Sequence, residues 1–200
     1  LYYLLQDQGK NRYKPLPIYG EKKVAPTFHT VRGAKVPDTI YHQIAGLEFL
    51  DQKGQNVKWE QYKGKIVIFG LFYTRSADKL SVKAANAAIQ SLANTYAKKE
   101  ILNFISLTID PVHDKPAVLE QYADSVSAKT GKWDLLTGDS TKVFNFVNEG
   151  LRLDAHQTFS PNEMKYSYSN FLVLVDPQRR IRGYYEATNQ EAISKLDDEI

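Results

Sequence analysis

The sequence predicts an α/β domain in which helices flank a sheet, and two patterns carry this prediction. Three long apolar runs, at residues 66–72, 101–109 and 170–175, resemble central strands that are buried on both faces. Residues 82–96 and 116–126 repeat their apolar side chains at intervals of three and four, which is the spacing of an amphipathic helix. Strands that alternate with helices favour a layered α/β fold.

A β-hairpin is predicted at the start of this domain. Residues 47–50 and 57–59 form its strands, and the polar residues 51–54 form its turn. The strand at 66–72 follows, and then a helix that ends near Lys98-Lys99, whose charges suit the negative end of a helix. The apolar stripe of this helix consists of Val82, Ala85, Ile89, Leu92 and Tyr96.

The middle of the chain continues the alternation. Asp110-Pro111 ends the second strand, and Pro116 suits the first turn of the next helix. A short strand is predicted at 133–136. The inner face of the helix consists of Val118, Leu119, Tyr122, Ala123 and Val126.

The last third holds a helix, a hairpin and a closing helix. Residues 137–140 start a helix that ends near Gly150. The strand at 170–175 and a return strand at 181–185 form a hairpin around a polar turn. Residues 188–191, Thr-Asn-Gln-Glu, fit a capping box for the closing helix.

The N-terminal residues 1–45 are predicted to be an extended arm or linker, because they are rich in proline and show little periodicity. The chain opens on Leu1-Tyr-Tyr-Leu-Leu5, which we interpret as the outer end of an upstream membrane anchor or signal segment, with a frayed chain end as the alternative. Five residues cannot span a bilayer, which needs about 20.

The composition of the chain excludes cysteine-based chemistry and argues against nucleic-acid binding. The chain has no cysteine, which excludes disulfides, thiolate metal sites and thiol redox chemistry. Its formal net charge is +3, and its longest basic clusters are pairs such as Lys22-Lys23, so nucleic acid is not expected as a partner.

The order of elements and four sequence strings together resemble a known family. Strand, helix, strand, helix, β-hairpin and closing helix is the thioredoxin arrangement. The strings YKGKIVIFGLFYTR, SLTIDPVHDKPAVLEQYA, WDLLTGD and FLVLVDPQRRIRGYY resemble successive signature segments of the Sco/SenC family. The resemblance implies a thioredoxin-like Sco/SenC domain over 46–200 that handles copper during cytochrome oxidase assembly. It also implies an extracytoplasmic (periplasmic) location and a membrane tether outside this chain.

The copper ligands of that family have no counterpart in this sequence. The family carries two cysteines in the turn after the first core strand and a histidine nine residues before the Pro of a later Asp-Pro turn. Ser76 and Leu80 stand at the cysteine positions, and Tyr168 stands nine residues before Pro177. Because copper prefers thiolate and imidazole ligands, we expect no copper cofactor.

A non-catalytic, protein-binding role is therefore predicted, near respiratory oxidase or copper-handling machinery. We expect the turn at 72–81 to lie beside residues 166–168, with Tyr168 at least partly exposed. The candidate binding surface consists of Phe72, Arg75, Asp78, Lys79, Tyr166 and Tyr168. Membrane contact is expected only through the upstream anchor.

Two alternatives stay open. The first is an enzyme or small-anion binder that uses a remodelled pocket around Arg75, Ser76, Asp78 and Tyr168, next to a helix N-terminus. Ser76 and Lys79 also have the S-x-x-K spacing of serine acyl enzymes, although the companion motifs stand in the wrong order.

The second alternative is a weak, non-thiolate metal site that uses His113 or His156. A solvated loop histidine is the simpler interpretation of each, because neither has a second histidine at metal-ligand spacing. Turn and capping roles are expected for the carboxylates at the strand ends and helix starts, namely Asp110, Asp114, Asp139 and Asp176.

Overall fold

A five-stranded sheet forms the centre of the computed structural model, which describes residues 15–160 and 163–200. The strand order is β11-β10-β5-β6-β7. The strands β5 (Ile66–Phe72), β6 (Leu102–Thr108) and β7 (Trp133–Leu136) run parallel. The hairpin of β10 (Phe171–Val175) and β11 (Ile181–Glu186) joins β5 in antiparallel orientation. The long apolar runs therefore occupy the middle of the sheet.

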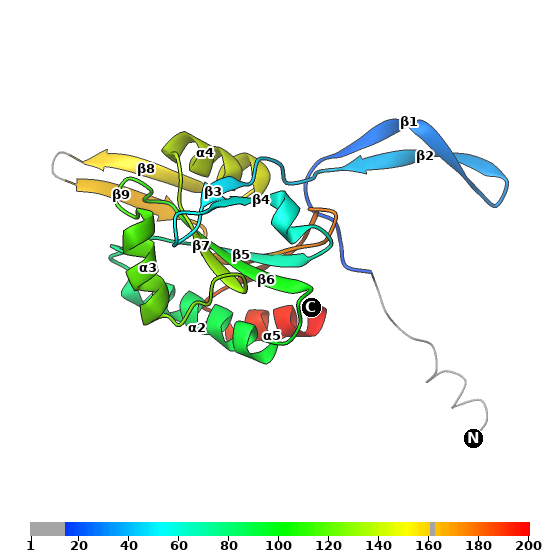
Figure 1. The fold of residues 1–200 in the computed structure, drawn as a ribbon. Helices are drawn as coiled ribbons and strands as arrows, with labels where there is room; N and C mark the ends of the chain where they lie inside the picture. The colour runs from blue at the N-terminus through cyan, green and yellow to red at the C-terminus, as the bar shows by residue number, and fades with distance from the viewer. Residues whose placement is uncertain (1–14, 161–162) are drawn as a thin grey trace, which may run out of the picture.

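Three helices cover one face of this sheet (Figure 1). They are α2 (Lys79–Thr95), α3 (Pro116–Ser125) and α5 (Gln190–Glu199). The apolar stripe predicted for α2 packs here, because Ala85, Ile89 and Leu92 belong to one buried cluster with the sheet.

The opposite face is covered by shorter elements (Figure 1). They include the predicted hairpin of β3 (Glu48–Leu50) and β4 (Asn56–Lys58) and the 3-10 turn η1 (Trp59–Tyr62). The helix α4 (Ser140–Asn145) continues as a π-helical turn, η2 (Phe146–Gly150), and contributes to the same cluster. Both faces of the sheet are thus buried, which confirms the predicted α/β class.

The N-cap of the closing helix lies one residue later in the chain than predicted. Asn189, not Thr188, is the N-cap of α5, and its Oδ1 accepts hydrogen bonds from the backbone N–H groups of Glu191 and Ala192. Asn and Ser are stronger N-caps than Thr, so the neighbouring Asn takes this role.

Two antiparallel hairpins were not predicted. The pair β1 (Lys22–Val31) and β2 (Ala34–Tyr41) lies within the expected extended arm, so that expectation was wrong for these residues. The pair β8 (Ala155–Ser160) and β9 (Glu163–Tyr168) lies between η2 and β10. Both hairpins extend beyond the sheet, at opposite ends of the molecule (Figure 1).

The expected membrane anchor concerns Leu1–Leu5, which lie outside the described residues. Within residues 15–160 and 163–200, no helix is long and apolar enough to cross a bilayer.

Candidate functional site

The turn after β5 is held by a fully buried carboxylate from the neighbouring strand connection. Because β5 and β6 are parallel neighbours, the segments that follow them meet at one edge of the sheet. Asp114 Oδ2 accepts hydrogen bonds from the Thr74 backbone N–H at 3.0 Å and from Thr108 Oγ1 at 2.6 Å. Its Oδ1 also contacts Thr74 Oγ1 and His113 Nδ1. Asp114 thereby fixes the turn at Thr74.

A second buried carboxylate, Asp110, fixes the next residue of the turn. Asp110 Oδ2 accepts hydrogen bonds from Arg75 Nη2 at 2.6 Å and Arg75 Nε at 3.1 Å. Asp110 Oδ1 accepts a third from the Tyr166 hydroxyl at 2.8 Å. The hydrogen bond to Asp110 raises the pKa of the half-exposed Arg75 guanidinium, so this guanidinium stays charged. Asp110 therefore joins the turn after β5 to strand β9.

Three tyrosines form an aromatic group beside this ion pair. The ring of Tyr73 lies 5.3 Å from that of Tyr166 and 6.2 Å from that of Tyr168, measured between centroids. Burial raises the pKa of Tyr168 above its ordinary value, so its phenol stays protonated at neutral pH. Tyr166 and Tyr168 are each partly exposed, and with Arg75 they leave polar and aromatic groups at the surface.

The three positions of the missing copper ligands do not form a metal site. Ser76 is 2% exposed, whereas Leu80 is 82% exposed. Leu80 has no ligand atom, and the protonated phenol of Tyr168 is a poor donor for a soft ion. The residues present therefore do not fit copper.

Nucleophilic chemistry is not set up at Ser76 either. The hydroxyl of Ser76 has no hydrogen-bond partner among the described side chains, so no base is placed to take its proton. Asp78 is instead the N-cap of α2 and accepts a hydrogen bond from the Ser81 backbone N–H at 3.0 Å. The S-x-x-K spacing from Ser76 to Lys79 here marks the start of a helix.

The comparisons with known proteins agree with this geometry. A family model described as SCO1/SenC matches residues 41–199. The chain belongs to the SCO1/SenC family. The SCO1 protein homolog of Bacillus subtilis (strain 168) is 27% identical over 143 residues, which make up 70% of this chain and 73% of that protein.

Solved structures of SCO1/SenC proteins share the fold. Copper-bound ScoI from Bradyrhizobium japonicum matches with a TM-score of 0.63 at 20% identity, over 79% of this chain and 99% of that one. A SCO1/SenC family lipoprotein from Bacillus anthracis str. Ames matches with a TM-score of 0.65 at 21% identity, over 79% and 93%. The predicted family and thioredoxin-like fold are confirmed.

Most of the predicted binding surface comes together at this SCO1/SenC turn, but one member does not. Arg75 and Tyr166 share Asp110, and Asp78 and Lys79 begin the helix that follows. Phe72 is 3% exposed and stacks on Tyr122 in the interior, so its side chain is removed from the candidate surface. The last residue of a central strand is buried between sheet and helices.

One observation is in line with the alternative of a non-thiolate metal site at His113. Ligand atoms of Asp110, His113 and Asp114 lie within 4.8 Å of one another. Each carboxylate is already satisfied, however, and the Arg75 guanidinium occupies the position of a cation on Asp110. His156 contacts the exposed Asp154 at 3.7 Å on the surface, and no such group among residues 15–160 and 163–200 includes it.

Three roles in this site differ from their expected ones. Asp110 and Asp114 are buried anchors of the turn, not ordinary turn residues, and His113 is bound to Asp114 and not simply solvated. One sequence signal pointed to this arrangement: polar residues follow two consecutive apolar strands, and the ends of parallel neighbours meet. Asp139 and Asp176 keep the expected capping and turn roles.

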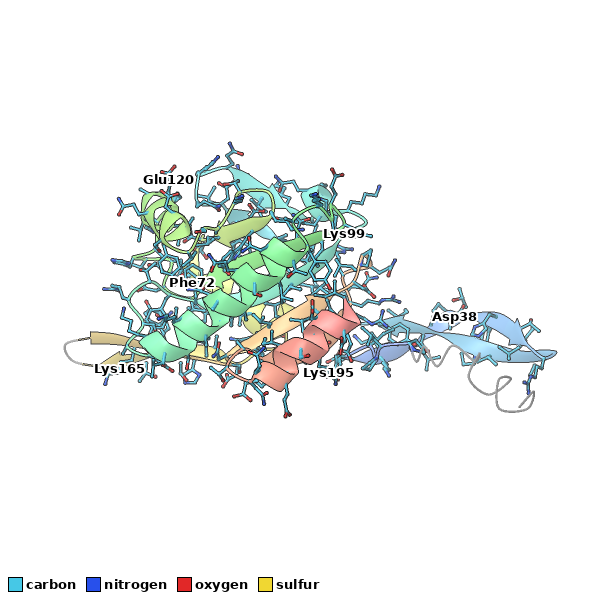
Figure 2. All side chains as sticks on the ribbon, turned by 90° about the horizontal axis from the view of Figure 1, so that it is seen from below. Asp38, Phe72, Lys99, Glu120, Lys165 and Lys195 are labelled. Atoms are coloured by element: carbon cyan, nitrogen blue, oxygen red, sulfur yellow. The ribbon has the colours of Figure 1, made fainter. Side chains whose placement is uncertain are left out.

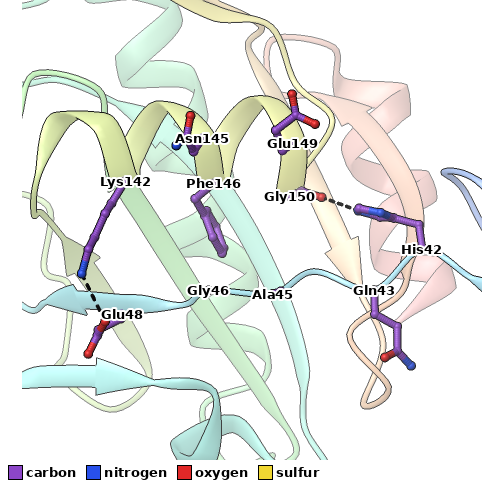
Figure 3. A pocket seen from close by; sticks show the side chains of 10 residues that line it. All are labelled: His42, Gln43, Ala45, Gly46, Glu48, Lys142, Asn145, Phe146, Glu149 and Gly150. Atoms are coloured by element: carbon purple, nitrogen blue, oxygen red, sulfur yellow. Dashed lines mark hydrogen bonds and ion pairs between the residues drawn. The ribbon is translucent and has the colours of Figure 1, made fainter.

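Two of the hollows formed by the described residues bear on the site and its surroundings. A groove of about 350 Å³ begins at the turn after β5 and continues between α2 and α3. Its lining residues include Ser76, Lys79, Lys83 and Tyr122. A hollow of about 400 Å³ lies between residues 42–48 and α4–η2 (Figure 3). In this second hollow His42 Nε2 pairs with the Gly150 carbonyl and Lys142 pairs with Glu48, so its polar groups tie two segments together.

Proposed function

We propose that this SCO1/SenC chain is a non-catalytic module that binds a protein partner near respiratory oxidase or copper-handling machinery. One observation carries the proposal: the turn that would hold the copper ligands is instead locked by the buried Asp110 and Asp114, with Arg75, Tyr166 and Tyr168 at its surface. A locked turn without ligands suits recognition, because its side chains are already ordered before a partner arrives.

The setting of this function is proposed from relatives. A structure of BsSco, 20% identical to this chain, is described as a member of the Sco family of cytochrome c oxidase assembly proteins. The Bacillus anthracis relative is described as a lipoprotein. These descriptions support an extracytoplasmic location for this chain and a membrane tether outside the described residues.

Site-specific photocrosslinking tests the proposed surface. A photoreactive phenylalanine analogue is placed at position 168, and a matched control is placed at Lys195 on the exposed side of α5 (Figure 2). We expect position 168 to yield a discrete crosslink to an oxidase subunit or copper-handling protein in cells, and position 195 to yield none. Equal crosslinking from both positions, or crosslinks solely to unrelated proteins, would contradict the proposal.

A small-anion binder is the second candidate, and the groove between α2 and α3 is the observation that favours it. Ser76 and the cations Lys79 and Lys83 line this groove, and no acidic side chain does. Titration with inorganic phosphate, followed by NMR of the backbone amides, tests this role. Shifts at 76–83 that disappear in Lys79→Gln/Lys83→Gln, but persist in Lys195→Gln, would support it.

A further inference from the structure

The β1–β2 hairpin projects from the domain without a core beneath it (Figures 1 and 2). Its base is closed by a hydrogen bond from the His42 backbone N–H to the Glu21 carbonyl, and of its strand residues Ala25 alone is buried. An isolated two-stranded hairpin is marginally stable in water. The hairpin also lies almost wholly outside residues 41–199, which match the family. A surface that covers the hairpin would therefore stabilise it.

Large apolar side chains are exposed along the whole hairpin. Val24 is 76% exposed, Phe28 61% and Ile40 53%, and Val31 and Val36 are exposed at the tip. Scattered apolar residues are common on protein surfaces, but here they dominate one projecting element.

The apolar residues of the tip occupy both faces of the hairpin. Residues directly opposite each other in an antiparallel pair share a face, and successive residues alternate. Phe28 pairs with Pro37 on one face, whereas Val31 pairs with Ala34 on the other, where Val36 also lies. A flat protein surface would cover one of these faces and leave the other in water. A surrounding medium would cover both.

The edges of the hairpin disfavour pairing with another strand. Pro26 in β1 and Pro37 in β2 lack the N–H group that a new neighbour would need, and the register shifts between Val24 and Phe28. Prolines and irregularities of this kind protect exposed edges. Strand addition, from a second copy or from a peptide, is therefore disfavoured.

The positive charges on the β1–β2 hairpin indicate which kind of medium would surround its tip. Arg32 and Lys35 lie at the tip, and Lys22 and Lys23 lie at the base. The nearby acid Asp38 is bound to His29 Nδ1 at 2.6 Å. Long cationic side chains beside apolar ones suit the boundary between acyl chains and anionic headgroups, where the apolar part is buried and the charge stays at the phosphates.

We propose that the β1–β2 hairpin places its tip in the headgroup layer of an anionic lipid surface. The chain enters the domain at the same end: Arg182 donates to the carbonyls of Leu16 and Pro17, and the Tyr19 backbone N–H bonds to the Ile181 carbonyl. This orientation rests on the membrane tether proposed above. The hairpin would then hold the domain against the membrane, with the β8–β9 end directed away from it (Figure 1).

Vesicle binding of the 200-residue chain tests the proposal. Flotation is measured with vesicles of phosphatidylcholine alone and with vesicles that contain 30% phosphatidylglycerol. We expect binding to the anionic vesicles, weakened by salt. Arg32→Gln/Lys35→Gln should bind about 30-fold more weakly, because each cation near an anionic surface contributes about a fivefold factor. Val31→Ser/Val36→Ser should also lose binding, whereas Val112→Ser, which alters another exposed valine, should bind like the unmodified chain.

A fluorescent label shows whether the tip itself enters the lipid. Because the chain has no cysteine, Val31→Cys and the control Leu80→Cys each provide one site for an environment-sensitive dye. We expect a blue shift with anionic vesicles at position 31 and none at position 80. Absence of vesicle binding, unchanged binding of both tip variants, or a shift at position 80 alone would overturn the proposal. Crosslinking from position 168 in β9 does not use the tip of the β1–β2 hairpin, so failure of the two proposals is distinguishable.

Discussion

At the residue scale, two buried carboxylates explain why the turn keeps its shape without metal ligands. A buried charge is costly unless charged or hydrogen-bonding groups surround it. Asp114 is 0% exposed and is surrounded by donors from Thr74, Thr108 and His113, while Asp110 is paired with Arg75 and Tyr166. The two carboxylates thus join β5, β6 and β9 at one point.

Removal of the Asp114 carboxylate should destabilise the whole domain. Asp114→Ala leaves the partly buried Thr74 N–H and the buried Thr108 hydroxyl without this acceptor, so we expect the free energy of unfolding to fall by about 3 kcal/mol. Urea denaturation followed by circular dichroism measures this change. The matched control Asp124→Ala removes an exposed carboxylate from α3 and should change stability by less than about 0.5 kcal/mol. Equal effects of the two variants would contradict this role of Asp114.

The same residues predict how the chain responds to copper. With Ser76, Leu80 and Tyr168 at the ligand positions, the purified protein should not bind stoichiometric Cu(I) more tightly than about micromolar, since tight Cu(I) sites use soft ligands. Competition with a chromophoric Cu(I) chelator measures the affinity. Ser76→Cys/Leu80→Cys/Tyr168→His should gain binding, because it restores two thiolates and an imidazole. Tight binding by the unmodified chain would refute this assignment.

At the element scale, burial decided what the sequence could predict. The strands β5 and β10 have apolar side chains on both faces because both faces are packed, and this leaves a clear pattern. The hairpin β1–β2 faces solvent on both sides, so no alternation between buried and exposed positions marks it. The fold class could be predicted from such local patterns.

The candidate site could be predicted less completely, because its contacts join residues far apart in the chain. The Tyr166 hydroxyl bonds to Asp110 across 56 positions, and Thr74 bonds to Asp114 across 40. Sequence comparison with the family located the turn and the position of Tyr168. It could not show that Phe72 points inward or that Asp110 and Asp114 anchor the turn.

The turn between β10 and β11 should give the domain an acid-sensitive contribution to its stability. Burial alone would raise the pKa of Asp176, but hydrogen bonds from Arg180 and Arg182 outweigh it and hold the pKa below its ordinary value of 3.8. A lowered pKa in the folded state stabilises the fold above pH 3.8, and this contribution is lost as the pH falls through the lowered value.

Asp176→Asn isolates this contribution. It should be less stable than the unmodified chain at neutral pH, and the difference between the two should shrink below about pH 4. Urea denaturation between pH 2.5 and pH 7, chosen to span this range, measures the difference. Asp124→Asn, at an exposed position, should show no comparable pH dependence. A difference that stays constant down to the lowest pH would contradict the assignment.

At the scale of the whole molecule, the two unpredicted hairpins place the two proposed binding surfaces at opposite ends of the molecule. The β8–β9 hairpin carries Tyr166 and Tyr168 to the locked turn, and the β1–β2 hairpin carries exposed apolar and cationic residues away from it (Figures 1 and 2). The packed sheet and its helices lie between them. Changes at distant sites without shared partners usually add independently.

Substitutions at one end should therefore impair the binding function of that end and leave the other binding function unchanged. Val31→Ser/Val36→Ser should lose vesicle binding and keep both its thermal midpoint and the partner captured from position 168, because both valines are exposed to solvent. Tyr168→Ala should weaken capture of that same partner, since loss of an interface tyrosine costs roughly 2 kcal/mol or about 30-fold in affinity, and should keep vesicle binding. Affinity is measured in detergent-free solution with the partner identified by crosslinking. If the tip variant also loses the partner there, the hairpin belongs to the protein interface, and the membrane assignment fails.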